Sequence, residues 1–159
     1  MSTSIEPFAV QPGAGARLET PTGDTAYVLT NTRSTHGSLT MLELVISAKN
    51  GPALHVHHRE DEVWYVLEGQ FRFKAGDEMF WVSEGGLAFG PRGTPHNFQN
   101  VGEAPGRLLV ITAPSGAERL FEDFAELLPG PVSPEALASL ARANWLEFVG
   151  PQLKDSDPL

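Results

Sequence analysis

The sequence contains no cysteine among its 159 residues. This absence excludes disulfides, thiolate metal sites, iron–sulfur clusters and cysteine nucleophiles. Basic residues are also few, since Lys and Arg total 11 against 20 Asp and Glu, which gives a formal net charge of −9. An acidic chain without a basic run is a poor match for the phosphate backbone of nucleic acids. We therefore expect no nucleic-acid partner.

Long apolar runs are missing as well. No stretch approaches the ~18 consecutive apolar residues of a membrane helix, so we expect no membrane partner. The first ten residues lack the basic and apolar regions of a signal peptide, and we expect a cytoplasmic protein. With 41% apolar and 19% charged residues, the composition is typical of one globular domain.

The chain divides by composition into four parts. Residues 1–24 are rich in Pro, Gly, Ser and Thr and are predicted to form an N-terminal arm. Residues 25–114 show short strand patterns separated by Gly, Pro and Asn, which predict an all-β barrel. Segments such as Leu42–Ile46 and Leu108–Ile111 are apolar on both faces, so their outer face needs a helix or a second subunit. We therefore expect a homodimer.

Helical patterns follow the barrel. Residues 115–150 are predicted to form a C-terminal helical extension of two helices, and residues 151–159 a frayed tail. Ser133 and Pro134 are typical of a helix N-cap and the first helical position. The apolar stripe predicted for the second helix is formed by Leu137, Leu140, Ala141, Trp145 and Phe148. We expect these helices to pack against the barrel or a partner, with a lid as the alternative.

The histidines are clustered. Five occur, and His55, His57 and His58 precede Glu62, whereas His96 follows a Pro- and Gly-containing turn. Side chains two apart on a strand share a face, so His55 and His57 point the same way and His58 points away. Imidazole nitrogens and a carboxylate oxygen are suitable ligands for a divalent transition metal. The pattern predicts one mononuclear site whose ligands are His55, His57, Glu62 and His96.

These residues lie in two recognisable motifs. Gly51, His55, His57, Glu62 and Gly69 are similar to the first cupin motif, although the gap between Gly51 and His55 is two residues shorter than usual. The second cupin motif is matched at every spacing by Gly85, Pro91, Gly93, His96 and Asn100. The resemblance covers roughly residues 25–115. It implies an all-β, double-stranded β-helix (jelly-roll) barrel, here followed by two C-terminal α-helices.

Aromatic residues on the same strands suggest a pocket. If Glu62 points into the barrel, then so does Trp64, and Phe98 follows His96 inward. Phe71 and Phe73 share a face, while their neighbours Arg72 and Lys74 share the opposite one. We therefore predict that Trp64, Phe71, Phe73 and Phe98 line a substrate pocket, although a purely structural core is the competing interpretation.

The resemblance to small quercetin 2,3-dioxygenase-like cupins implies a metal-dependent dioxygenase. Its substrate would be an aromatic or enolic small molecule of the flavonol type, with O2 as a candidate second substrate. Glu62 would be the catalytic base as well as a ligand. The metal would be one Fe, Ni, Mn or Co ion per chain, and Zn is compatible with an isolated preparation. Two alternatives stay open: a non-redox Lewis-acid cupin (isomerase, lyase or polyketide-cyclase-associated) and a non-catalytic metal- or ligand-binding cupin.

Other polar residues carry weaker signals. Glu60 and Asp61 are predicted to lie in an exposed turn, and Arg92 to be a solvated turn residue. Asn100 is predicted to bond the backbone rather than a metal, because amides are weak ligands for such ions.

Overall fold

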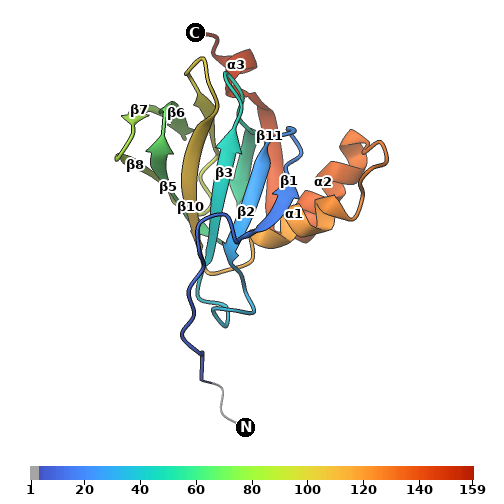
Figure 1. Ribbon diagram of the computed structural model, residues 1–159. Helices are drawn as coiled ribbons and strands as arrows, with labels where there is room; N and C mark the ends of the chain where they lie inside the picture. Colours follow the sequence, from blue (N-terminus) through green and yellow to red (C-terminus); the bar gives the residue numbers. More distant parts are fainter. Residues whose placement is uncertain (1–3) are drawn as a thin grey trace.

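Two antiparallel sheets face each other in the computed structural model, which describes residues 4–159 (Figure 1). The first three residues of the predicted arm lie outside the described residues. In sheet order, the first sheet contains β1 (Ala16–Glu19), β2 (Thr25–Thr30), β3 (Thr40–Ile46), β10 (Gly106–Ala113), β5 (Asp61–Glu68) and β8 (Leu87–Gly90). The second contains β11 (Leu146–Gln152), β4 (Ala53–His57), β9 (His96–Asn100), β6 (Gln70–Ala75) and β7 (Glu78–Ser83). The predicted all-β jelly-roll class is confirmed.

The core lies between the two sheets and follows the two-residue alternation of the strands. Phe71 and Phe73 are both 0% exposed, which confirms that their shared face is the inner one. The rings of Trp64 and Phe73 have centroids 5.4 Å apart, and Phe98 packs beside them. Burial of each such side chain contributes about 1.5–3 kcal/mol to folding. These rings belong to the core that packs between the two sheets.

Two kinds of glycine constrain the strands that carry the motifs. Gly69 and Gly85 have φ of 91° and 84°, the left-handed conformation that glycine adopts without a steric penalty. Gly51 is required for a different reason, because a Cβ at this position would lie 1.9 Å from the carbonyl oxygen of Phe98. The segment before β4 therefore lies directly against β9, the strand that begins with His96.

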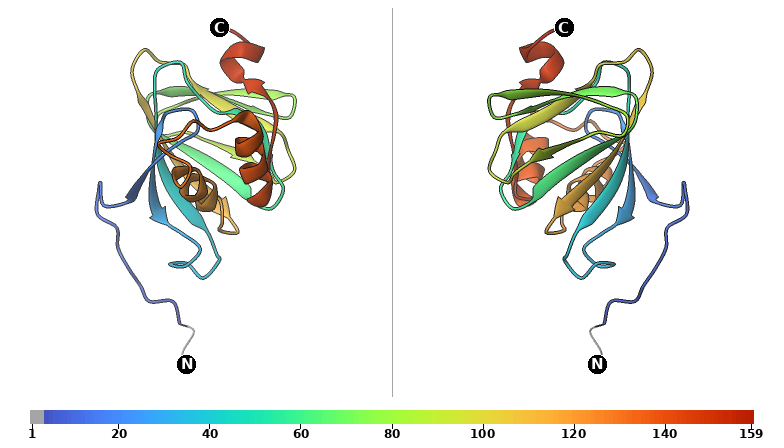
Figure 2. Two further views of the ribbon diagram at one scale, coloured as in Figure 1. Left: turned by 90° about the vertical axis from the view of Figure 1, so that its right-hand side faces the viewer. Right: turned by 90° about the vertical axis from the view of Figure 1, so that its left-hand side faces the viewer.

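Helices α1 (Glu118–Ala125) and α2 (Pro134–Ala143) lie together on one side of the barrel, close to β1 and β11 (Figure 2). The predicted N-cap is confirmed, since the Ser133 hydroxyl accepts a hydrogen bond of 3.1 Å from the Ala136 N–H. A last single-turn helix, α3 (Leu153–Ser156), follows β11. Among the described residues, no helix has the length and apolar character needed to cross a membrane.

The sequence prediction places the end of the second helix too far along the chain. Helix α2 stops at Ala143, Trp145 is exposed with φ of 59°, and Phe148 lies in β11. Strand β11 pairs with β4, placing Leu146 opposite His57 and Phe148 opposite His55. The apolar spacing fits either structure locally, but pairing satisfies the backbone groups at the open edge of β4.

Two further segments and one side chain differ from what the sequence predicts. The predicted arm includes β1, which pairs with β2 from Ala16 to Glu19. The predicted tail is anchored, because Leu153 is 1% exposed. Arg72 does not face solvent: its guanidinium is buried and donates to the Gln99 side chain and to the carbonyl oxygens of Leu153 and Asp157. The C-terminal segment thus covers a face that strand alternation alone assigns to water.

The outer face of the first sheet keeps an apolar character. Tyr65 pairs with Leu87 and Val63 with Phe89, so these four side chains share that face. Tyr65, Leu87 and Phe89 are exposed. The homodimer predicted from such faces stays a prediction.

Candidate metal centre and its cavity

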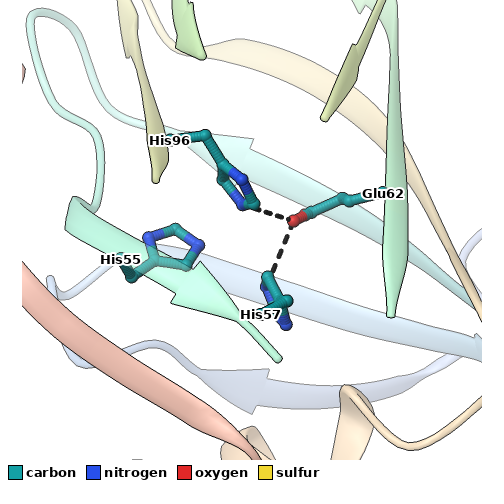
Figure 3. A group of neighbouring side chains, drawn as sticks. All are labelled: His55, His57, Glu62 and His96. Atoms are coloured by element: carbon teal, nitrogen blue, oxygen red, sulfur yellow. Dashed lines mark hydrogen bonds and ion pairs between the residues drawn. The ribbon is translucent and has the colours of Figure 1, made fainter. Parts of the chain in front are cut away.

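The predicted ligands come from both sheets and converge between them (Figure 3). Strand β4 carries His55 and His57, and His96 begins β9 directly opposite His55 in the register. Glu62 lies near the start of β5 in the facing sheet. His55 and His96 are 41 positions apart in the chain and meet because β4 pairs with β9. Glu62 approaches them from β5 in the facing sheet.

The four side chains form a buried cluster. One ligand atom from each of His55, His57, Glu62 and His96 lies within 4.8 Å of all the others. Glu62 Oε2 is 3.1 Å from His57 Nε2 and 3.0 Å from His96 Nε2. The structure therefore brings together the whole predicted ligand set.

Backbone carbonyls orient two of the imidazoles. His55 Nδ1 lies 2.8 Å from the carbonyl oxygen of Ala53, and His96 Nδ1 lies 3.0 Å from that of Thr94. A neutral ring that donates from Nδ1 has its lone pair on Nε2, which is the atom needed for a metal. Three neutral imidazoles and one carboxylate suit a divalent transition ion, so the residues fit the group that the motifs imply.

The charges in the cluster favour one internal ion pair. Burial, together with the charges of His96 and His57, lowers the pKa of His55 to about 3, so this ring is neutral. Burial opposes ionisation of Glu62, but the adjacent His57 and His96 hold the pKa of this carboxyl well below its usual value. Burial also opposes the charged form of His57, yet Glu62 and Glu60 outweigh it and raise the pKa of His57 to about 9. The metal-free cluster thus contains one proton on His57 that a metal must displace.

This proton predicts how metal affinity depends on pH. Because the pKa of His57 is raised to about 9, the ring is protonated at neutral pH and must release one proton when it becomes a ligand. Apparent affinity for Co²⁺ should therefore rise about tenfold per pH unit between pH 6 and 8 and level off above about 9. Isothermal titration in buffers of different ionisation enthalpy measures the protons released. An affinity that does not change over this range would contradict the predicted charge state.

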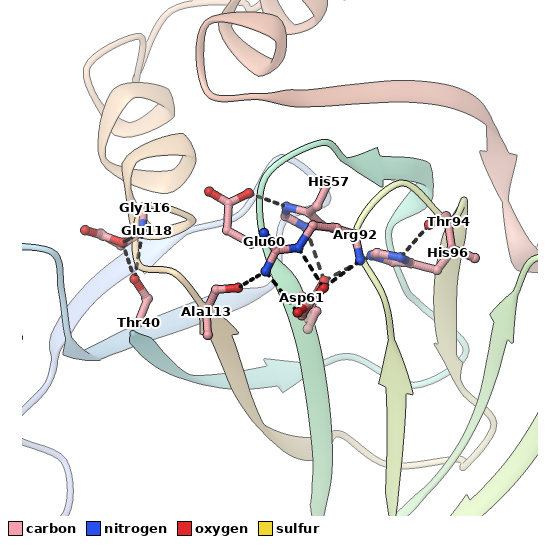
Figure 4. A network of polar contacts seen from close by, with 11 residues as sticks. Thr40, His57, Glu60, Asp61, Arg92, Thr94, His96, Ala113, Gly116 and Glu118 are labelled. Atoms are coloured by element: carbon pink, nitrogen blue, oxygen red, sulfur yellow. Dashed lines mark hydrogen bonds and ion pairs between the residues drawn. The ribbon is translucent and has the colours of Figure 1, made fainter. Parts of the chain in front are cut away.

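Glu60 is a site residue that the sequence analysis missed. It was predicted to be exposed but is 2% exposed, because the loop before α1 covers it: a Cβ at Gly116 would lie 3.3 Å from Glu60 Oε1 (Figure 4). Its Oε2 lies 3.6 Å from His57 Nδ1 and has no hydrogen-bond partner within residues 4–159. The Glu60 carboxylate thus lies beside Nδ1 of His57, just as backbone carbonyl oxygens lie beside Nδ1 of His55 and His96.

Replacing Glu60 with glutamine should weaken metal binding about 10- to 100-fold, because the outer partner of a ligating imidazole fixes its orientation and basicity. Chelator competition with Co²⁺ measures the change. Asp61→Asn is the matched control, since Asp61 is adjacent to Glu60 in the sequence but is only half-buried and pairs with Arg92 at 3.0 Å. Equal affinities in the Glu60→Gln variant and the unmodified protein would show that Glu60 does not support His57.

The other predicted polar roles divide clearly. Arg92 is paired with Asp61 at the surface, in agreement with its prediction as a turn residue. His58 is exposed and lies 3.1 Å from Glu147, away from the cluster. The Asn100 amide donates to the carbonyl oxygens of Ile46 and Ala104, which confirms its backbone-bonding role.

A cavity of about 350 Å³ opens from the cluster towards the helices. Of the predicted pocket residues, only Phe98 lines it; Trp64, Phe71 and Phe73 do not and belong to the core beneath. The pocket prediction does not hold for these three residues, because their rings pack against one another in the core. The apolar wall comes instead from β3, β10, α1, α2 and β11; its members include Leu42, Leu44, Ile46, Val110, Leu120, Phe121, Leu137, Ala138, Leu146 and Phe148.

Comparisons with known proteins agree with this architecture. The sequence model of the family described as "Cupin domain" matches residues 42–112. An uncharacterized protein of Methanocaldococcus jannaschii is 30% identical over 74 residues, which cover 46% of this chain and 59% of that protein. The chain therefore matches only part of this curated relative.

Two solved structures share the fold. A predicted oxalate decarboxylase from Thermotoga maritima superposes with a TM-score of 0.61 and 18% identity, covering 67% of this chain and 99% of that one. An RmlC-like cupin from Shewanella frigidimarina gives a TM-score of 0.59 and 19% identity, covering 71% and 95%. These two structures show the fold alone, and the family model matches residues 42–112, the part of the barrel that carries the four-residue cluster.

Proposed function

We propose that this protein is a mononuclear metal-dependent dioxygenase that acts on an aromatic or enolic small molecule of the flavonol type. One observation carries the proposal: a buried three-histidine, one-carboxylate cluster opens directly into a mainly apolar cavity. The donor set suits Fe, Ni, Mn or Co, and zinc fits an isolated preparation. A bound metal would act as a Lewis acid on a substrate oxygen and, when redox-active, would supply the electron chemistry that O2 requires.

Glu62 has the geometry for a proton acceptor. Its carboxylate is 7% exposed, lines the cavity and lies within 3.1 Å of two imidazole nitrogens that keep it ionised. A substrate hydroxyl placed at the cluster would therefore meet an ionised carboxylate, and proton transfer to Glu62 from a hydroxyl made acidic by the Lewis-acid metal would leave an electron-rich enolate.

The cavity wall supports the same chemistry. The aliphatic and aromatic side chains from α1, α2 and β11 make the space above the cluster mainly apolar, so a bound substrate would displace water from it. Exclusion of water strengthens the electrostatic effect of Glu62 and the imidazoles on the substrate and limits side reactions of the enolate. The planar body of an aromatic substrate would be buried there without unpaired polar groups.

Oxygen consumption tests the proposal. Protein loaded separately with Fe²⁺, Ni²⁺, Mn²⁺ or Co²⁺ is mixed with quercetin in an oxygen electrode, and ring cleavage is followed by the loss of flavonol absorbance. We expect stoichiometric uptake of O2 with at least one metal and none with the metal-free protein. If the loaded protein converts an enolic substrate without O2 uptake, the non-redox alternative replaces this proposal; if it converts no substrate, the ligand-binding alternative does.

A further inference from the structure

The upper wall of the cavity comes from residues beyond the matched cupin domain. The family match ends at residue 112, whereas Leu120 and Phe121 of α1, Leu137 and Ala138 of α2, and Phe148 of β11 all line the cavity. These elements lie together over one side of the barrel (Figure 2). The shape and polarity of the space above the cluster are therefore set in part by a segment that lies outside the family match.

Away from the cluster, that space offers no positive side chain to a ligand. Among the lining residues that the structure describes, none is Lys or Arg. The ionisable lining residues are Asp24 and three members of the cluster, namely His55, His57 and Glu62. The carboxylate of Asp24 is already satisfied, because it accepts hydrogen bonds from the Ser47 N–H, the Thr22 hydroxyl and the Asn50 amide. A charged group remote from the cluster would be buried without a partner, at a substantial cost in free energy.

One polar atom in the wall lacks a partner. Thr112 is 1% exposed and lines the cavity, and its hydroxyl has no hydrogen-bond partner among the residues that the structure describes. Thr112 lies directly opposite Glu62 in the pairing of β10 with β5, so the two side chains share the inner face. A buried hydroxyl is normally paired, and a ligand oxygen next to the cluster is the partner that this position suits.

We propose that the cavity selects a neutral, mainly apolar molecule with two neighbouring oxygen functions, one directed to the cluster and the other to the Thr112 hydroxyl. This inference rests on the proposed function of the cluster and adds the substrate class and the residues that select it. Compact molecules with a second anionic group, such as dicarboxylates and sugar phosphates, are excluded by the uncharged wall that α1, α2 and β11 provide.

A matched pair of dyes tests the charge selectivity on metal-free protein. N-phenyl-1-naphthylamine is neutral, and 1-anilinonaphthalene-8-sulfonate is the same molecule with a sulfonate. By fluorescence titration we expect the neutral dye to bind at least tenfold more tightly. Ala138→Trp should weaken its binding at least tenfold by filling the cavity. The control Ala136→Trp makes the same change at an exposed position of the same helix and should not. Equal binding of the two dyes, or an unaffected Ala138→Trp variant, would overturn the inference.

A second titration tests Thr112. The probe 3-hydroxyflavone carries adjacent hydroxyl and carbonyl oxygens, and its binding to Thr112→Val should be about three- to tenfold weaker than to the unmodified protein. Binding of the oxygen-free dye should be unchanged, which also shows that the variant is folded. Unchanged binding of 3-hydroxyflavone would overturn the role of Thr112. Because both titrations use metal-free protein, they can succeed when oxygen uptake fails, and fail when it succeeds.

Discussion

Replacing His96 with alanine is expected to abolish stable metal binding. The side chain of His96 is fully buried, its Nε2 lies 3.0 Å from Glu62, and its ring centroid is 4.6 Å from that of His55. The variant loses one of the four predicted ligands, and each of the other three residues offers one ligand atom of its own. Isothermal titration with Co²⁺ should show an affinity at least a thousandfold weaker than that of the unmodified protein, in keeping with the strong dependence of metal sites on ligand count.

The matched control is His58→Ala. His58 is adjacent to a predicted ligand in the sequence but is exposed and lies 3.1 Å from Glu147, so its loss should leave the Co²⁺ affinity unchanged. His55→Ala should behave like His96→Ala. If His58→Ala emptied the site while His57→Ala left it full, the assignment of the ligands would be wrong.

Glu62→Gln is expected to have the second-largest effect. Glutamine preserves the shape of the side chain but removes the charge that pairs with His57 and the only carboxylate that the four-residue cluster contains. At saturating metal, the rate of O2 uptake with quercetin should fall about 10²- to 10⁴-fold, the usual contribution of a positioned base. Metal affinity should also decrease, because a neutral amide is a weaker ligand.

The control for this variant is Glu147→Gln, which removes a carboxylate that pairs with an exposed histidine outside the cavity. Its O2 uptake should equal that of the unmodified protein. A Glu62→Gln protein that binds metal and keeps its full rate would show that Glu62 is not the proton acceptor.

The ligand set could be predicted from the sequence because strand geometry has a simple rule. His55 and His57 are two residues apart and therefore share a face, and the Pro91–Gly93 turn leads into the strand that begins with His96. The turn conformations of Gly69 and Gly85 could also be predicted from the sequence, and both residues adopt positive φ. Local periodicity and turn chemistry were enough for the all-β class and for the four candidate ligands, whereas the jelly-roll barrel was implied by the resemblance to cupins.

The features that depend on long-range contacts were not predictable in this way. Phe148 fits a helical stripe, but it lies in β11 because this strand pairs with the open edge of β4. Glu60 looks like an exposed turn residue until the loop at Gly116, 56 residues later, covers it. Trp64, Phe71 and Phe73 face inward as expected, yet only the position of the helices decides which inward residues meet the cavity. These three errors all concern what packs over a face, which the pattern of one strand does not encode.

The most direct test of the central claim is the metal content of the purified protein after exposure to an equimolar mixture of Fe²⁺, Ni²⁺, Mn²⁺, Co²⁺ and Zn²⁺, followed by gel filtration. The four-ligand cluster predicts about one divalent ion per chain in total by elemental analysis, and less than about a tenth of that in His96→Ala. A folded protein that takes up none of these metals, or a His96→Ala variant that retains a full complement, would contradict it.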